Sequence, residues 1–163
     1  MSYPEPRYLD EVGEISAVLH PATNPPDLIT GPGSDAHYLA TAATTGGDFG
    51  LYRWNMGVSP SGPGPHYHRT MSESFFVVSG LVRLYDGVDW VESGPGDFLY
   101  VPPGGVHGFR NESGEPASIL ILFTPGAPRE AYFEGLVDFA SRSEPPSEAE
   151  KAEFYLLHDN IWV

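Results

Sequence analysis

The sequence predicts an all-β domain, a sandwich or barrel of short strands, with one or two helices at its C-terminal end. The 163 residues suffice for one domain with its own core. The chain contains 19 Gly and 17 Pro without a collagen-like repeat, which indicates many tight turns. Between residues 36 and 124, short apolar runs alternate with turn residues. That spacing is typical of sandwiches and barrels and not of βαβ units.

The elements can be assigned in chain order. Residues 1–35 are rich in Pro and Gly, and we expect an N-terminal arm or edge strands there. The barrel region, 36–124, is predicted to hold strands at 36–45, 49–58, 65–69, 74–78, 81–86, 88–92, 97–101, 106–110 and 117–124. Asp86-Gly87 lies between two of these runs and favours the type I′ turn of a tight hairpin.

Residues 125–163 are predicted to form a helical segment that packs on the same domain. Pro128 suits the first turn of a helix over 128–141. Its apolar residues recur at three- and four-residue spacing, and they are Tyr132, Phe133, Leu136, Val137 and Ala140. Ser147 and Glu150 form a capping box for a second helix that ends near Leu157. The first helix either packs on the barrel or forms a lid over its mouth.

Charge and composition exclude several classes of partner. The formal net charge is −14 with 8 Lys and Arg, so we expect neither nucleic acid nor an anionic membrane surface as a partner. The chain has no Cys, which excludes disulfides and thiolate metal sites. No apolar stretch is long enough to span a bilayer, and residues 1–7 lack the pattern of a signal peptide. A cytoplasmic protein is therefore expected.

Four residues form a candidate metal site. His66 and His68 are two apart on a predicted strand and point to one face. Glu73 opens the next strand, and His107 follows the tight turn at 102–105. Three imidazoles and one carboxylate suit one divalent Fe, Mn, Ni, Co or Zn ion better than Ca²⁺ or Mg²⁺. Four protein ligands leave open positions, as catalytic sites do. The alternative is a set of buried, hydrogen-bonded histidines without metal.

Two motifs identify a resemblance to the cupin superfamily, specifically to small single-domain, metal-binding cupins similar to the quercetin dioxygenases. The first motif runs from His66, His68 and Glu73 to Gly80, with Pro60 where the family usually has Gly. The second comprises Gly96, Pro102, Gly104, His107 and Asn111. The resemblance implies a double-stranded β-helix (jelly-roll) barrel with the metal inside. It also implies a homodimer, since cupins commonly pair their barrels.

The function implied by this resemblance is that of a metal-dependent enzyme acting on a small aromatic or enolisable molecule. A dioxygenase-type oxidoreductase is favoured, because the complete set of three His and one Glu is common in that group. A non-redox cyclase or isomerase, similar to polyketide cyclases, is one alternative. A binding or sensing cupin without turnover is another.

Three residues near the ligands are candidates for roles beyond metal binding. Glu73 is either a fourth ligand or a catalytic base that takes a proton from a substrate hydroxyl. Phe75 shares a strand face with Glu73, and Phe109 shares one with His107. Both phenylalanines are therefore predicted to line the substrate pocket.

Overall fold

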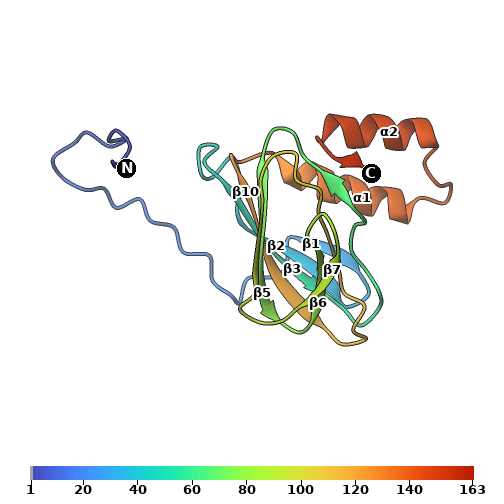
Figure 1. Ribbon diagram of the computed structural model, residues 1–163. Helices are drawn as coiled ribbons and strands as arrows, with labels where there is room; N and C mark the ends of the chain where they lie inside the picture. Colours follow the sequence, from blue (N-terminus) through green and yellow to red (C-terminus); the bar gives the residue numbers. More distant parts are fainter. Residues whose placement is uncertain (1) are drawn as a thin grey trace.

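The structure, a computed structural model, describes residues 2–163 and contains two main β-sheets and two helices. The larger, six-stranded sheet has the order β1 (Leu28–Gly31), β2 (Ser34–Ala40), β3 (Gly50–Met56), β10 (Ala117–Thr124), β5 (Ser72–Ser79) and β8 (Phe98–Val101). A three-stranded sheet has the order β7 (Trp90–Ser93), β6 (Val82–Tyr85) and β9 (Gly108–Arg110). Figure 1 shows the strands stacked into one β-domain with both helices at one end.

The core lies between the two sheets. Strand β10 pairs with β3 and β5 in a register that sets Ile121 beside Tyr52 and Phe75. These inward side chains are fully buried, as alternation along a strand requires. Phe109 of the smaller sheet meets Phe75 of the larger at a ring separation of 5.5 Å. This arrangement confirms the predicted fold class, a double-stranded β-helix (jelly-roll) with C-terminal helices.

The loop between Tyr85 and Trp90 has a different conformation from the predicted one. The hairpin of β6 and β7 exists, but its loop has four residues, because Tyr85 pairs with Trp90. A type I′ turn needs positive φ at both central residues, and among residues 2–163 only Asp159 and glycines adopt it. Asp86 instead accepts hydrogen bonds from the backbone N–H groups of Val88 and Asp89, both at 2.9 Å. The predicted turn type was therefore wrong, since the Asp86 side chain closes the loop.

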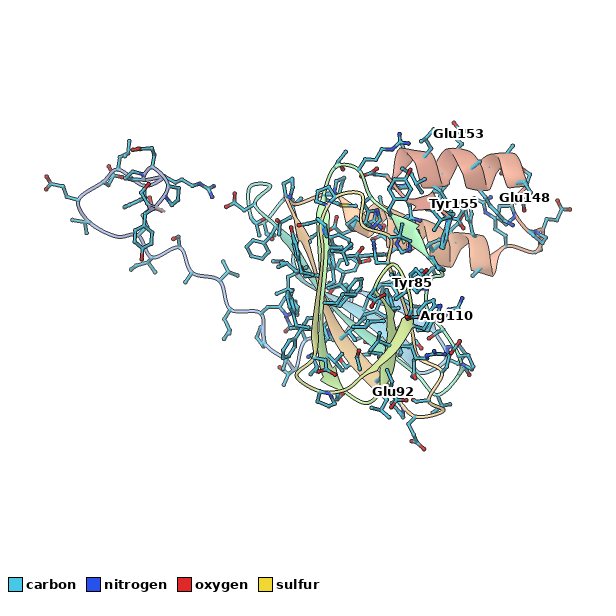
Figure 2. All side chains as sticks on the ribbon, viewed as in Figure 1. Tyr85, Glu92, Arg110, Glu148, Glu153 and Tyr155 are labelled. Carbon is cyan, nitrogen blue, oxygen red and sulfur yellow. The ribbon has the colours of Figure 1, made fainter. Side chains whose placement is uncertain are left out.

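The two helices begin and end within a residue of the prediction. Helix α1 spans Arg129–Ser141 and α2 spans Glu148–Leu157. The capping box is confirmed: Ser147 Oγ accepts from the Glu150 N–H, and Glu150 Oε2 accepts from the Ser147 N–H at 2.8 Å. Figure 2 shows Tyr155 on the side of α2 that faces the domain and Glu153 on its outer side.

Close contact between the helices depends on Gly135 of α1. A Cβ at this position would lie 2.4 Å from the Phe154 ring of α2, well inside contact distance. After α2 the chain returns to the β-domain as β11 (Ile161–Trp162), which pairs with β4 (His66–Tyr67). This last strand was not predicted. It brings the C-terminal residues beside two of the candidate ligands.

The N-terminal residues precede the first strand as an extended segment. Residues 2–27 contain no helix or strand, and the apolar run at 15–19 is exposed. Figure 1 shows this segment leaving the β-domain as an arm. The sheet itself begins at Leu28, where β1 forms its edge. Within residues 2–163, no helix has the length and apolar character needed to cross a bilayer.

Candidate metal centre

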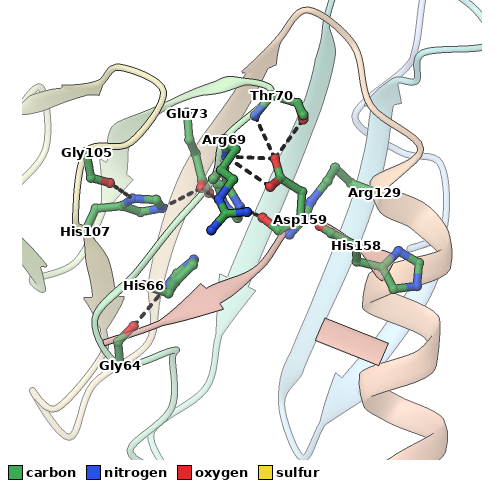
Figure 3. Close-up of polar contacts among 11 residues, drawn as sticks. Gly64, His66, Arg69, Thr70, Glu73, Gly105, His107, Arg129, His158 and Asp159 are labelled. Atoms are coloured by element: carbon green, nitrogen blue, oxygen red, sulfur yellow. Dashed lines mark hydrogen bonds and ion pairs between the residues drawn. The ribbon is translucent and has the colours of Figure 1, made fainter. Parts of the chain in front are cut away.

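The four candidate ligands come together in the folded chain. His66 lies on β4, Glu73 is the second residue of β5, and His107 immediately precedes β9. The backbones of His66 and His107 bond to each other at 2.9 and 2.8 Å, which fixes two ligand-bearing segments side by side. All four side chains are buried, and one ligand atom from each lies within 4.8 Å of the others. Figure 3 shows His66, His107 and Glu73 converging from separate segments of the chain.

The outer nitrogen of each imidazole faces a backbone carbonyl. His66 Nδ1 lies 2.9 Å from the Gly64 oxygen, and His107 Nδ1 lies 2.9 Å from the Gly105 oxygen. His68 Nδ1 lies 2.5 Å from the Asp159 oxygen. A carbonyl only accepts, so these contacts assign the proton of each neutral ring to Nδ1 and leave Nε2 with a lone pair. Metal-binding histidines are oriented in this manner.

The inner nitrogens meet the Glu73 carboxylate. Glu73 Oε2 lies 2.9 Å from His68 Nε2 and 2.7 Å from His107 Nε2. Each of these two rings thus faces an acceptor at both nitrogens, whereas a neutral imidazole carries only one N–H. The centre therefore requires a positive charge, which protonated rings or a metal ion can supply. Three lone pairs and one carboxylate are a donor set that fits one divalent metal ion.

Burial and the contacts among these four side chains determine their protonation states. The pKa of His66 is lowered to about 4, chiefly because burial disfavours the charged ring. The pKa of the Glu73 carboxyl lies well below its usual range, since hydrogen bonds from His107 and His68 outweigh the effect of burial. Burial would lower the pKa of His107, but Glu73 raises it above its ordinary value. Near pH 7 the centre accordingly offers an ionised carboxylate and a neutral His66.

A cavity of about 470 Å³ opens onto this centre. His66 and Glu73 lie in its wall, so two of the candidate ligands reach the same space. Its aromatic lining comes from strands, from both helices and from β11, and comprises Trp54, Phe109, Phe123, Tyr132, Phe133, Tyr155 and Trp162. The apolar face predicted for residues 128–141 forms one side of this cavity. Both α1 and the C-terminal strand therefore shape the space in front of the metal centre.

The two predicted pocket phenylalanines are placed differently. Phe109 lines the cavity, whereas Phe75 does not. The Phe75 ring is fully buried beneath the centre, 5.8 Å from the His107 ring and 5.5 Å from the Phe109 ring. Strand alternation correctly predicted the sheet face on which Phe75 lies. It could not predict that the ring lies too deep in the core to reach the cavity. Phe75 therefore supports His107 from below and does not reach the cavity.

Three residues at the site were missed by sequence reasoning, namely Arg129, Asp159 and Trp162. Arg129, the first residue of α1, is buried and lines the cavity. The Asp159 carbonyl accepts from His68, and its carboxylate accepts from the backbone of Arg69 and Thr70. The Trp162 ring packs 5.2 Å from the His66 ring. All three lie beyond the motifs. A basic residue beside an otherwise apolar helix face was the only signal for Arg129.

The motif residues that are not ligands have structural roles. Asn111 Nδ2 donates to the carbonyls of Gly57 at 2.9 Å and Glu115 at 2.7 Å. Gly62 has a φ of +122°, and a Cβ there would lie 2.1 Å from the Phe109 carbonyl oxygen. Only glycine allows this close approach. The loop around Pro60 thus keeps a required glycine two residues later, with the ligand positions intact.

Comparison with known proteins identifies the family. A family model for the cupin domain matches residues 53–123. The chain is 30% identical over 96 residues to quercetin 2,3-dioxygenase of Bacillus subtilis, which covers 59% of this chain and 28% of that protein. The chain therefore spans less than a third of that relative's length. It is also 32% identical over 92 residues to an uncharacterized protein of Streptomyces coelicolor, covering 56% of this chain and 83% of the relative.

Solved structures share the fold. KdgF from Halomonas sp. superposes with a TM-score of 0.52 at 21% identity, covering 61% of this chain and 86% of that one. The polyketide cyclase RemF from Streptomyces resistomycificus has a TM-score of 0.52 at 23% identity, covering 66% of this chain and 78% of that one. At these identities the likeness concerns the fold alone.

Proposed function

The chain belongs to the cupin superfamily, and from that premise we propose that it is a metal-dependent enzyme acting on a small aromatic or enolisable molecule. The observation that carries this proposal is the buried cluster of His66, His68, Glu73 and His107 at the wall of an aromatic cavity. A cavity of about 470 Å³ falls in the range of small-molecule sites. Besides the aromatic residues, the polar side chains in its wall are His66 and Glu73 of the cluster, Arg129, and the hydroxyl residues Thr30, Ser34, Ser59 and Ser61.

The residues that would hold the metal are the three histidines, through Nε2, and Glu73, through its carboxylate. A divalent Fe, Mn, Ni, Co or Zn ion bound there would supply Lewis acidity and, if redox-active, a position for dioxygen. The backbone carbonyls of Gly64, Gly105 and Asp159 hold the three rings in the required orientation. The aromatic walls exclude water and position an apolar substrate body.

Glu73 has two proposed roles, metal ligand and proton acceptor. Its position in the cavity wall allows either role. One ligand atom from Glu73 and from each of the three histidines lies within 4.8 Å of the others, so all four can bind the same ion. That observation favours the ligand role. Glu73 would act as the base only when it is released from the metal ion.

Among reaction types, we propose a dioxygenase-type oxidation. The identity to the Bacillus subtilis quercetin dioxygenase supports this choice, although the aligned region is a fraction of that protein. A non-redox cyclase or isomerase would use the same residues to polarise a carbonyl without consuming oxygen. A sensing protein would bind the ligand in the same cavity and release it unchanged.

Metal reconstitution with a substrate panel tests these proposals. Protein loaded separately with Fe, Mn, Ni, Co or Zn is given flavonols, phenols and enolisable ketones, and oxygen uptake and products are followed with and without air. We expect oxygen uptake with a redox-active metal and none with Zn. Product formation without oxygen uptake would support the cyclase or isomerase. Tight binding without turnover across the panel would contradict an enzyme and support a sensor. His107→Ala, loaded in parallel, is the inactive control.

A further inference from the structure

Arg129 is a buried cation facing the cavity. Its side chain starts at the first residue of α1, it is 3% exposed, and it forms part of the cavity wall. Nη1 donates to the His158 carbonyl at 2.7 Å, as Figure 3 shows. Nε is buried and has no hydrogen-bond partner. Since guanidinium remains protonated in proteins, Arg129 brings a full positive charge into this space.

The carboxylates near Arg129 are committed elsewhere. Within residues 2–163, no Asp or Glu oxygen lies within 4.0 Å of the guanidinium, although nine other ion pairs form at that distance. Glu130, the next residue, accepts a hydrogen bond from Tyr52. Glu73 contacts two histidines, and Asp159 accepts from Thr70. The charge of Arg129 therefore lacks a direct counterion.

Aromatic rings hold the guanidinium in place. Its carbon lies 4.2 Å from the centre of the Tyr132 ring and 5.0 Å from that of the Phe123 ring. Such contacts stabilise a cation only modestly, whereas burial of a charge without a counterion carries a much larger desolvation penalty. The rings and the single carbonyl thus offset only part of the penalty. They fix the orientation of a cation that still lacks an anion.

Arg129 lies one aromatic ring away from the metal centre. The Phe123 ring that contacts the guanidinium also lies 6.2 Å from the His68 ring. Three neutral imidazoles and one carboxylate neutralise only half the charge of a divalent ion, so the loaded centre and Arg129 together remain cationic. An anionic ligand that reaches both places would balance this charge.

We propose that Arg129 binds a carboxylate of the substrate. The substrate class is then an aromatic or apolar carboxylic acid whose remote enol, phenol or carbonyl oxygen lies at the metal centre. Nη1 already donates to the His158 carbonyl. The guanidinium edge that includes Nε therefore remains available to donate to the carboxylate. The oxidation or isomerisation of this substrate rests on the proposed function, but binding of the carboxylate at Arg129 does not.

The binding test compares matched ligands on matched variants. Wild-type protein loaded with Zn is titrated calorimetrically with 4-hydroxycinnamate and 4-hydroxyphenylacetate, whose phenol is remote from the carboxylate, and with the corresponding neutral amides. We expect the acid to bind at least about tenfold tighter than its amide, as for a charge-assisted pair in a buried site. Arg129→Met should abolish this preference. Arg129→Lys should retain part of it, because ammonium keeps the charge but not the fork.

Several outcomes separate this inference from a structural role and from the proposed function. Equal affinity for acid and amide in the wild type, or no binding of either acid, overturns the inference, as does an unchanged preference in Arg129→Met. Metal content of Arg129→Met should equal that of the wild type. If Arg129→Met does not fold, Arg129→Lys decides the question. A preference for the acid as large as in the wild type would then contradict bidentate binding of the carboxylate by the guanidinium. Acid preference without turnover leaves Arg129 assigned and refutes the enzyme. Turnover of neutral substrates that Arg129→Met leaves unchanged supports the enzyme and refutes the role of Arg129 in substrate binding.

Discussion

Asp159 ties the C-terminal segment to the metal centre, and its replacement gives a prediction with a calculable size. Its carboxylate accepts from the Arg69 N–H at 2.9 Å, the Thr70 N–H at 2.8 Å and the Thr70 hydroxyl at 2.7 Å. Its own carbonyl accepts from His68 Nδ1. Its φ is +52°, in the left-handed region. Asp159→Ala removes the three carboxylate contacts and places a strained residue at this turn.

The expected loss follows from these contacts. Arg69 and Thr70 are exposed, so each hydrogen bond contributes about 0.5–1 kcal/mol, less than a buried charged one. Three bonds amount to about 2 kcal/mol, and left-handed backbone adds about 1 kcal/mol for alanine. Asp159→Ala should therefore lower the free energy of unfolding by about 3 kcal/mol. Asp159→Asn tolerates the backbone and keeps one oxygen, so its loss should be about 1 kcal/mol.

Urea unfolding of the metal-free protein measures the loss in the free energy of unfolding, and competition with a chelator measures metal affinity. We expect about 10- to 100-fold weaker metal binding in Asp159→Ala, because the acceptor that orients His68 is displaced. Asp159→Asn should bind metal nearly as the wild type does. The reasoning is refuted if Asp159→Ala unfolds within about 0.5 kcal/mol of the wild type. An asparagine variant as damaged as the alanine one would contradict the backbone contribution.

Three further predictions concern packing, pH and assembly. Gly135→Ala should destabilise the protein by about 1–3 kcal/mol in urea unfolding, because the new methyl group would clash with the Phe154 ring, and this outweighs the better helix propensity of alanine. The control, Glu134→Ala at the neighbouring exposed position, should change the free energy of unfolding little. The pKa of His66 is about 4 in the folded chain against 6.5 ordinarily, so only the unfolded state gains this proton as pH falls. The stability of metal-free wild type relative to His66→Gln should therefore drop by about 3 kcal/mol between pH 6.5 and 4, and an unchanged difference would contradict the burial argument. Light scattering should give twice the 17.7 kDa chain mass for the proposed homodimer, which a monomer at micromolar concentration would exclude.

The sequence predicted those features that depend on local patterns. Turn residues between short apolar runs located the strands from 34 to 124, and the Ser147 capping box located the start of α2. The ligands followed from motif spacing, because the two motifs supply all four residues and the backbone bridge between His66 and His107 sets the motifs side by side. Asp86 shows where local pattern was insufficient, because its side chain selected a longer loop than the Asp-Gly dipeptide suggests.

The remaining features depend on long-range packing, which leaves no local pattern. Strand β11 pairs with β4 across more than ninety residues, and this pairing alone brings Trp162 to His66. Arg129 becomes part of the cavity only because α1 packs over the end of the β-domain. Strand parity gives the face of Phe75 but not its depth, which depends on how the two sheets meet.

The central claim is that His66, His68, Glu73 and His107 hold one divalent metal ion, and metal content tests it most directly. Elemental analysis of protein isolated without added metal should find about one transition-metal ion per chain. His68→Ala and His107→Ala should each lose most of it. His37→Ala, which removes a buried histidine outside the cluster, should keep it. Full occupancy in both ligand variants, or no metal in the wild type even after reconstitution, would contradict the account.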